Sequence, residues 1–205
     1  MAVIHRQHNI TSEGVTTTVS EGTETTTGLD RALATLRIAF GVTFLWAFLD
    51  KAFALGFGTG AITDETSGAR TGIDFFAKDQ AWFNGGSPTE GFLTFAVPAD
   101  NPFKGFFNGL AGYAVVDWLF MLGLLGIGVT LLLGVGIRIG TAAGAAMYAL
   151  MYAASIPLEN NPVIDYHLTG LISMAVLGLA AVGTTWGLGG QWRKMPLVQK
   201  NPVLK

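Results

Sequence analysis

Four long apolar stretches divide this chain, and polar segments separate them. The stretches cover residues 33–55, 118–137, 139–156 and 163–182. A helix rises 1.5 Å per residue, so about 20 mostly apolar residues cross the roughly 30 Å of hydrocarbon in a bilayer. The pattern therefore predicts an all-α membrane protein whose fold is a bundle of four transmembrane helices.

The connections between the last three stretches are short. The letters GVGIRIG at 134–140 separate the second stretch from the third, and PLENNP at 157–162 separates the third from the fourth. In the latter connection Asn161 can cap a helix and Pro162 can occupy its first turn. Short connections predict antiparallel neighbours. Small residues favour close packing of these helices, namely Gly123, Gly126, Gly128 and the run GTAAG at 140–144.

The connection between the first and second stretches is unlike the others. Residues 58–112 form a long segment that is rich in aromatic side chains, and a free coil of that length is unusual. Within it, four apolar residues recur at helical spacing: Phe103, Phe106, Phe107 and Leu110. Such a stripe is typical of a helix that lies along a membrane interface. We therefore expect a partly helical lid over the outer mouth of the bundle.

Polar segments at the two ends complete the domain organisation. Residues 1–28 are rich in Thr, Ser, Glu and Gly and lack apolar periodicity, which predicts a disordered cytosolic tail. Residues 29–185 form the transmembrane domain, and 186–205 form a basic cytosolic tail. Orientation follows from the Lys and Arg of the flanking segments. With the N-terminus inside, the cytoplasmic cations (Arg6, Arg31, Arg138, Arg193, Lys194, Lys200 and Lys205) outnumber the outer ones (Arg70, Lys78 and Lys104). Both termini are therefore expected in the cytoplasm.

Composition narrows the classes of function. With 50% hydrophobic and only 13% charged residues, the chain is too apolar for an ordinary soluble domain. The absence of cysteine excludes disulfides, thiolate catalysis, iron–sulfur ligation and covalent c-type haem. No metal-ligand spacing is present. The net charge of −2 and the scattered cations argue against a nucleic-acid partner. Redox chemistry would therefore need a bound cofactor or a partner protein.

Ionisable residues gather at the predicted outer ends of the helices. Asp50 and Lys51 lie near the end of the first stretch, Asp117 at the start of the second, and Asp165 with His167 at the start of the fourth. Each carboxylate alone is explained as a cap or interfacial charge, since a helix N-terminus carries partial positive charge. Their convergence instead favours a site. We take His167, Asp165 and Asp117 as the candidate catalytic residues.

His167 limits which cofactors the chain could hold. It is the sole histidine outside the N-terminal tail, so this chain alone cannot hold a haem between two histidines. Because imidazole titrates near neutral pH, His167 could hydrogen-bond a quinone and exchange a proton with it. Alternatively it hydrogen-bonds Asp117 or a loop carbonyl and has no chemical role. The sequence leaves both interpretations open.

The candidate substrate-binding residues are Lys51, Asp50, Asn161, Arg37, Trp46 and Trp118. Arg37 lies deeper in the first stretch than a flanking charge, and a functional or buried paired role is as compatible with this as snorkelling to the interface. Trp46 and Trp118 fit the aromatic belt expected near a membrane surface. They could also line a flat apolar slot for a quinone ring.

Several stretches together resemble the DoxX family and, within it, the DoxD-like branch. They are LRIAFGVTFLWAFLDKAF from Leu36, SPTEGFL from Ser87, NPFKGFFNGLAG from Asn101, VVDWLFMLGLLGIGVTLLLGVGIRIG from Val115 and NNPVIDYH from Asn160. The resemblance extends over about residues 30–185. It implies a four-helix protein of the prokaryotic plasma membrane that is the membrane subunit of thiosulfate:quinone oxidoreductase, working with a second, smaller subunit.

Three functions follow as expectations. In the first, Lys51 attracts an anionic sulfur compound, a quinone accepts electrons, and His167 or an Asp handles the protons. In the second, the chain is a non-catalytic anchor that recruits redox or respiratory partner proteins. The third, a small carrier or channel, is disfavoured because the stretches hold few ionisable residues besides Arg37. The electron donor, the quinone type, the partners and the oligomeric state do not follow from the sequence.

Overall fold

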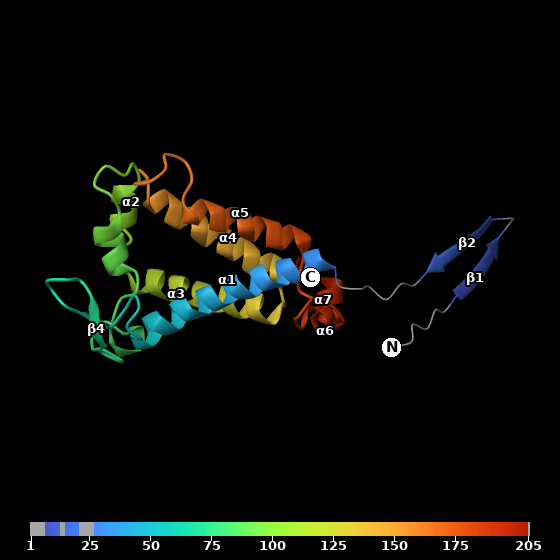
Figure 1. Ribbon diagram of the computed structural model, residues 1–205, viewed down its shortest axis with the longest axis horizontal. Helices are drawn as coiled ribbons and strands as arrows, with labels where there is room; N and C mark the ends of the chain where they lie inside the picture. The colour runs from blue at the N-terminus through green and yellow to red at the C-terminus, as the bar shows by residue number, and fades with distance from the viewer. Residues whose placement is uncertain (1–6, 13–14, 21–26, 205) are drawn as a thin grey trace.

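The computed structural model describes residues 7–12, 15–20 and 27–204, and it is mostly helical. Four long helices lie side by side in it: α1 (Gly28–Phe53), α3 (Ala114–Leu133), α4 (Ile137–Ala154) and α5 (Tyr166–Ala180) (Figure 1). Helix α1 packs on α3, α3 on α4, and α4 on α5. The prediction of a helix in each apolar stretch is therefore confirmed.

Side-chain caps decide where α1 and α5 begin. Thr27 caps α1 with a reciprocal pair of bonds, because its hydroxyl accepts from the Asp30 amide (3.2 Å) and the Asp30 carboxylate accepts from the Thr27 amide (2.7 Å). Helix α5 begins at Tyr166, and Asp165 caps it by accepting from the Leu168 amide at 2.9 Å. The predicted helix start at residue 163, with Asn161 as its cap, is therefore wrong.

Two of the four helices are long and apolar enough to cross a membrane by length and composition, α1 and α3. Helix α5 is apolar but has 15 residues. Helix α4 carries Arg138 and several Gly, Thr and Tyr residues, which lower its hydropathy. This is weaker support for a membrane location than the four spans expected from the sequence, so the number of spans stays a prediction.

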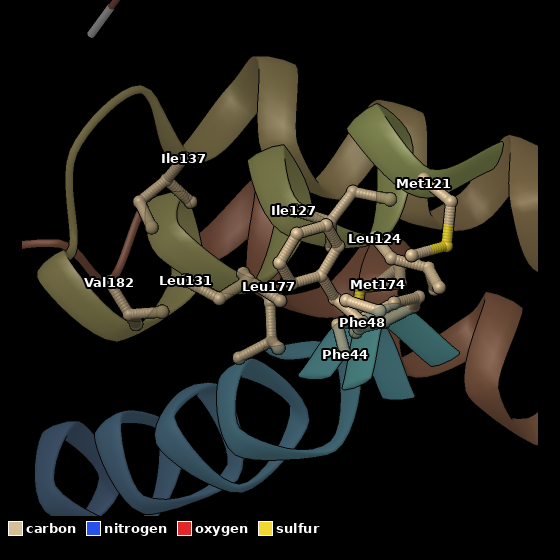
Figure 2. Close-up of a cluster of buried hydrophobic side chains, with 11 residues drawn as sticks. Phe44, Phe48, Met121, Leu124, Ile127, Leu131, Ile137, Met174, Leu177 and Val182 are labelled. Carbon is tan, nitrogen blue, oxygen red and sulfur yellow. The ribbon is translucent and has the colours of Figure 1, made fainter. Parts of the chain in front are cut away.

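The core lies between the four helices. Figure 2 shows most of its side chains turned toward one another; the cluster comprises Phe44, Phe48, Ala52, Met121, Leu124, Ile127, Leu131, Ile137, Met174, Leu177 and Val182. Helices α1 and α3 approach closely at Gly128, where an added Cβ would lie 2.8 Å from the Leu45 backbone nitrogen. At Gly126 an added Cβ would meet no atom within 4 Å. The predicted packing role therefore holds for Gly128 but not for Gly126.

The segment between α1 and α3, which we call the lid, contains short helices and a β-hairpin. Strands β3 (Ala61–Thr63) and β4 (Arg70–Ile73) pair antiparallel, and the helical pieces are η1 (Trp82–Asn84), η2 (Phe92–Ala96) and α2 (Lys104–Asn108). The lid lies at one end of the four helices (Figure 1). We call this the loop end and the opposite end the tail end. The partly helical character is as predicted, whereas the hairpin was not foreseen.

Helix α2 is shorter than the apolar stripe that predicted it. Phe107 is buried against Leu93, Val97 and Ala154, which form a second, small core under the lid. Phe103 and Phe106 are exposed instead. The stripe therefore does not face one surface as a unit, because the five residues of α2 make little more than one turn.

Both polar ends of the chain contain secondary structure in the residues that the structure describes. Strands β1 (Gln7–Ser12) and β2 (Val15–Ser20) pair antiparallel. Arg6, Lys205 and the remaining residues 1–5, 13–14 and 21–26 lie outside the described residues, so the disordered tail stays a prediction. At the C-terminal side, α6 (Gly189–Trp192), α7 (Pro196–Lys200) and η3 (Pro202–Leu204) fold at the tail end, where the Trp192 indole donates to the Leu204 carbonyl at 2.6 Å.

Candidate functional site

The candidate residues divide between the two ends of the molecule. Asp50 and Lys51 near the end of α1, Asp117 at the start of α3, and Asp165 with His167 at the start of α5 all lie at the loop end (Figure 1). These helix ends therefore lie at the same end of the molecule, but Asp50, Asp117 and His167 each have different hydrogen-bond partners, so a joint site stays a prediction. Arg37 lies far from them, near the tail end.

Asp50 holds the start of the lid. Its buried carboxylate accepts from two backbone amides, those of Phe57 at 3.0 Å and Gly58 at 2.7 Å. The Lys51 ammonium lies next to Gly58, 3.7 Å from where its Cβ would be. Asp50 therefore serves to close the turn after α1, and its two oxygens are occupied.

Asp117 holds the middle of the lid. One of its carboxylate oxygens accepts from the Thr89 hydroxyl at 2.6 Å, the Thr89 amide at 3.1 Å and the Ser87 hydroxyl at 3.0 Å. The Ser87 hydroxyl accepts in turn from the Glu90 amide at 3.2 Å. Asp117 is itself buried. These bonds join the first turn of α3 to the SPTE turn at 87–90. Asp117 therefore holds this part of the lid against α3.

The Asp165–His167 pair differs from both. His167 Nδ1 lies 2.6 Å from an Asp165 carboxylate oxygen, and the residue is only 2% exposed. A carboxylate accepts hydrogen bonds, so it holds the proton on Nδ1. The other ring nitrogen, Nε2, is buried and has no hydrogen-bond partner among residues 27–204. Buried polar atoms are nearly always paired, so this nitrogen is available to a ligand. The alternative contact with Asp117 is not made.

The tryptophans and Asn161 contact the chain around them. The Trp46 indole meets the Phe57 ring edge-on at 5.1 Å, and the Trp118 indole meets Trp82 at 4.7 Å. Both partners belong to the lid. The Asn161 side chain accepts from the Val163 and Ile164 amides at 2.9 Å each, so it shapes the turn before α5 and is exposed. These residues frame the loop end without meeting at one point.

Arg37 completes the end of α3. Its guanidinium donates to the carbonyls of Leu131 and, at 3.2 Å, Leu132, which belong to the last turn of that helix. It also donates to the carbonyls of Thr185 at 3.0 Å and Trp186 at 3.1 Å. The last carbonyls of a helix have no partner within it. Arg37 is fully buried, which favours the buried role over snorkelling, and its predicted part in substrate binding stays a prediction.

Asn101 is a buried polar residue that the sequence analysis did not select. Its side-chain amide donates to the carbonyls of Ala153 at 2.9 Å and Ala154 at 3.0 Å, and its oxygen accepts from the Phe103 amide at 2.7 Å. It therefore joins the lid to the end of α4. The Asn-Pro pair signals a turn, but the partner on α4 is distant in sequence and could not be read from it.

Two of the acids at the loop end have structural roles, whereas one side chain there is a candidate for catalysis. Asp50 and Asp117 hold the lid, while His167 offers a buried nitrogen oriented by Asp165. Within residues 27–204, no group of three or more His, Asp or Glu side chains could hold a metal ion. Comparison with protein-family models, with curated proteins and with solved structures finds no significant match.

Proposed function

We propose that the chain is a multi-pass membrane protein with four spans and both termini in the cytoplasm. Only 28% and 33% of the residues in the most apolar 18-residue stretches of α1 and α3 are buried within the chain. Most residues of these stretches are therefore at least partly exposed, which leaves apolar side chains for contact with lipid. Leu179 on α5 is 88% exposed and supports the same role for that helix.

We further propose that it is the membrane subunit of a redox complex in which His167 exchanges a proton with a quinone. One observation carries this proposal, the buried Nε2 of His167 held in place by Asp165. A quinone that takes up two electrons also takes up two protons, and Nε2 can relay them one at a time by binding a proton from water and passing it to a quinone oxygen. The resemblance to the DoxD-like branch adds thiosulfate, or a related sulfur compound, as the electron source.

The other loop-end residues take supporting roles in this proposal. Lys51, next to Gly58, supplies positive charge where a sulfur oxyanion would approach. Trp46 and Trp118 provide apolar surface beside the lid. Asp117 keeps the lid closed through Ser87 and Thr89. The electrons pass to the quinone through a bound cofactor or a partner subunit.

The test is thiosulfate-dependent reduction of a short-chain quinone by membranes that contain the protein and its candidate partner subunits. Substituting His167→Gln should lower turnover by about 100-fold or more, since a positioned acid–base group contributes that much. Ser173→Ala is the matched control, because Ser173 lies on the same helix and bonds only within it. Unchanged turnover in the His167 variant would refute the role of this residue.

A second function is favoured by the bonds of Asp50 and Asp117. Both acids are engaged by lid amides or hydroxyls, as expected if the loop end is a rigid surface that recruits redox partner proteins. In that case His167→Ala and Asp165→Ala should lower thermal stability and leave the turnover of the recruited enzyme unchanged. Selective loss of turnover in folded variants would contradict the anchor.

A further inference from the structure

Charge is distributed unevenly between the two ends of the molecule. At the tail end lie the cations Arg31, Arg138, Arg193, Lys194 and Lys200, and among residues 27–204 the acid found there is Asp30. The other acids of that range lie at the loop end or in its connections. The tail end is therefore a basic surface, and it would favour an anionic ligand.

A shallow, open cavity lies at the tail end. It has a volume of about 260 Å³ and is lined by Val135 from the α3–α4 turn and by Leu188, Gln191, Trp192 and Met195 from the C-terminal segment. Four of these five side chains are apolar. Arg193 and Lys194 lie between two lining residues in the chain, and both are exposed. Most of the apolar wall of the cavity and these cations therefore belong to the same segment of the chain.

The C-terminal segment also presents apolar side chains outward. The exposed ones are Trp186, Leu188, Met195, Leu197 and Val203. Arg193, Lys194 and Lys200 lie in the same segment, which follows α5 in the chain. Apolar and basic residues combined in this way suit a segment that lies on an anionic membrane surface. An exposed Trp, such as Trp186 here, is typical of the same interface.

Two of the cations already fix the segment in place. Arg193 donates to the Ala181 carbonyl at 2.9 Å, just after α5, and Arg138 donates to the Pro202 carbonyl at 3.1 Å. A guanidinium has five N–H donors, so each of these bonds uses a fraction of its capacity. The same side chains can therefore hold the segment and bind a phosphate oxygen.

We infer that the tail end binds an anionic phospholipid. The acyl chain enters the cavity lined by Val135, Leu188 and Trp192, and the phosphate pairs with Arg193 and Lys194. This inference requires a membrane location but does not depend on the redox role of His167. A free anion would gain nothing from the apolar wall, and an apolar ligand would gain nothing from the cations.

The test is direct binding of phosphatidylglycerol and phosphatidylcholine with identical acyl chains to the full-length protein in detergent, measured by native mass spectrometry. Phosphatidylglycerol should bind at least tenfold more tightly. Lys194→Gln should weaken it about fivefold, the effect of one cation near an anionic lipid surface, and Arg193→Gln with Lys194→Gln about 25-fold. Phosphatidylcholine binding should not change. The matched control is Lys104→Gln, which removes a cation at the loop end.

Three results would overturn the inference. They are equal binding of the two lipids, full retention of the preference in both tail-end variants, and an equal loss in Lys104→Gln. Free glycerol 3-phosphate tests the cavity, because it carries the phosphate without acyl chains and should bind at least 100-fold more weakly than phosphatidylglycerol. Binding of similar strength would exclude the cavity from the site. Neither outcome alters the turnover assay of His167.

Discussion

Arg37 offers the sharpest test of how the tail end is held together. Its guanidinium donates to four carbonyls, two in the last turn of α3 and two in the segment after α5. The neighbouring carbonyls of α3 have other partners, since Thr130 accepts from the Gly134 amide and Leu133 from the Leu188 amide. Leu131 and Leu132 rely on Arg37. Substituting Arg37→Met keeps much of the volume and removes every donor.

The magnitude follows from the carbonyls left behind. An unsatisfied buried acceptor costs about 1–3 kcal/mol, and the cost of burying the guanidinium, which is recovered in the variant, offsets part of that loss. We therefore expect Arg37→Met to lower the free energy of unfolding by about 3 kcal/mol. Arg37→Lys should lose about half as much, because an ammonium keeps the charge but lacks the planar fork.

Unfolding in mixed micelles, followed by circular dichroism, measures these losses. Arg31→Gln is the matched control, because Arg31 lies on the same helix and is exposed. Amide exchange should rise at 131–136 and 183–188 in Arg37→Met and stay unchanged at the loop end. Equal stability of the Arg37→Met and Arg31→Gln proteins would refute the reasoning, as would faster exchange spread evenly over the chain.

Three further predictions concern the helix crossing and the lid. Gly128→Ala should destabilise by about 1–3 kcal/mol through overpacking against Leu45, whereas Gly126→Ala, with open space around it, should be neutral or stabilising in the same unfolding assay. Asp117→Ala should speed proteolysis and amide exchange at 87–97, because it removes the oxygen that accepts three hydrogen bonds from the lid. Asp117→Asn keeps one oxygen and should have a smaller effect. No change in either variant would contradict the role of Asp117 in holding the lid. Hydrogen bonds hold the pKa of Asp64 below its usual value; the largest effect comes from the Ser67 amide, followed by the Ser67 hydroxyl and the Thr66 amide. The hairpin turn should therefore be fully stabilised above about pH 4 and should loosen as the pH falls through the lowered pKa. Exchange at 66–69 measures this, and Asp64→Asn should abolish the pH dependence.

Much of the candidate site could be predicted from the order of the elements. The long helices alternate in direction along the chain, so the end of α1 and the starts of α3 and α5 lie at the same end of the molecule, with Asp50, Asp117 and His167. What each residue does there could not be predicted. Asp117 bonds to Thr89, 28 residues away, and Asn101 bonds to Ala154, 53 residues away. Short sequence patterns do not indicate which residues will form hydrogen bonds across such separations.

The sequence by itself determined the four helical stretches, because apolar length and helix periodicity are local properties. It misplaced the start of α5, since Asn161 and Asp165 are both good caps and the choice depends on how the turn packs. The tertiary structure alone decided the role of Arg37, whose partners lie 94 and 148 residues further along the chain. It also left His167 Nε2 without a partner among the described residues. Burial and pairing arise when distant segments meet, and that is the physical reason why the fold was foreseen more fully than its chemistry.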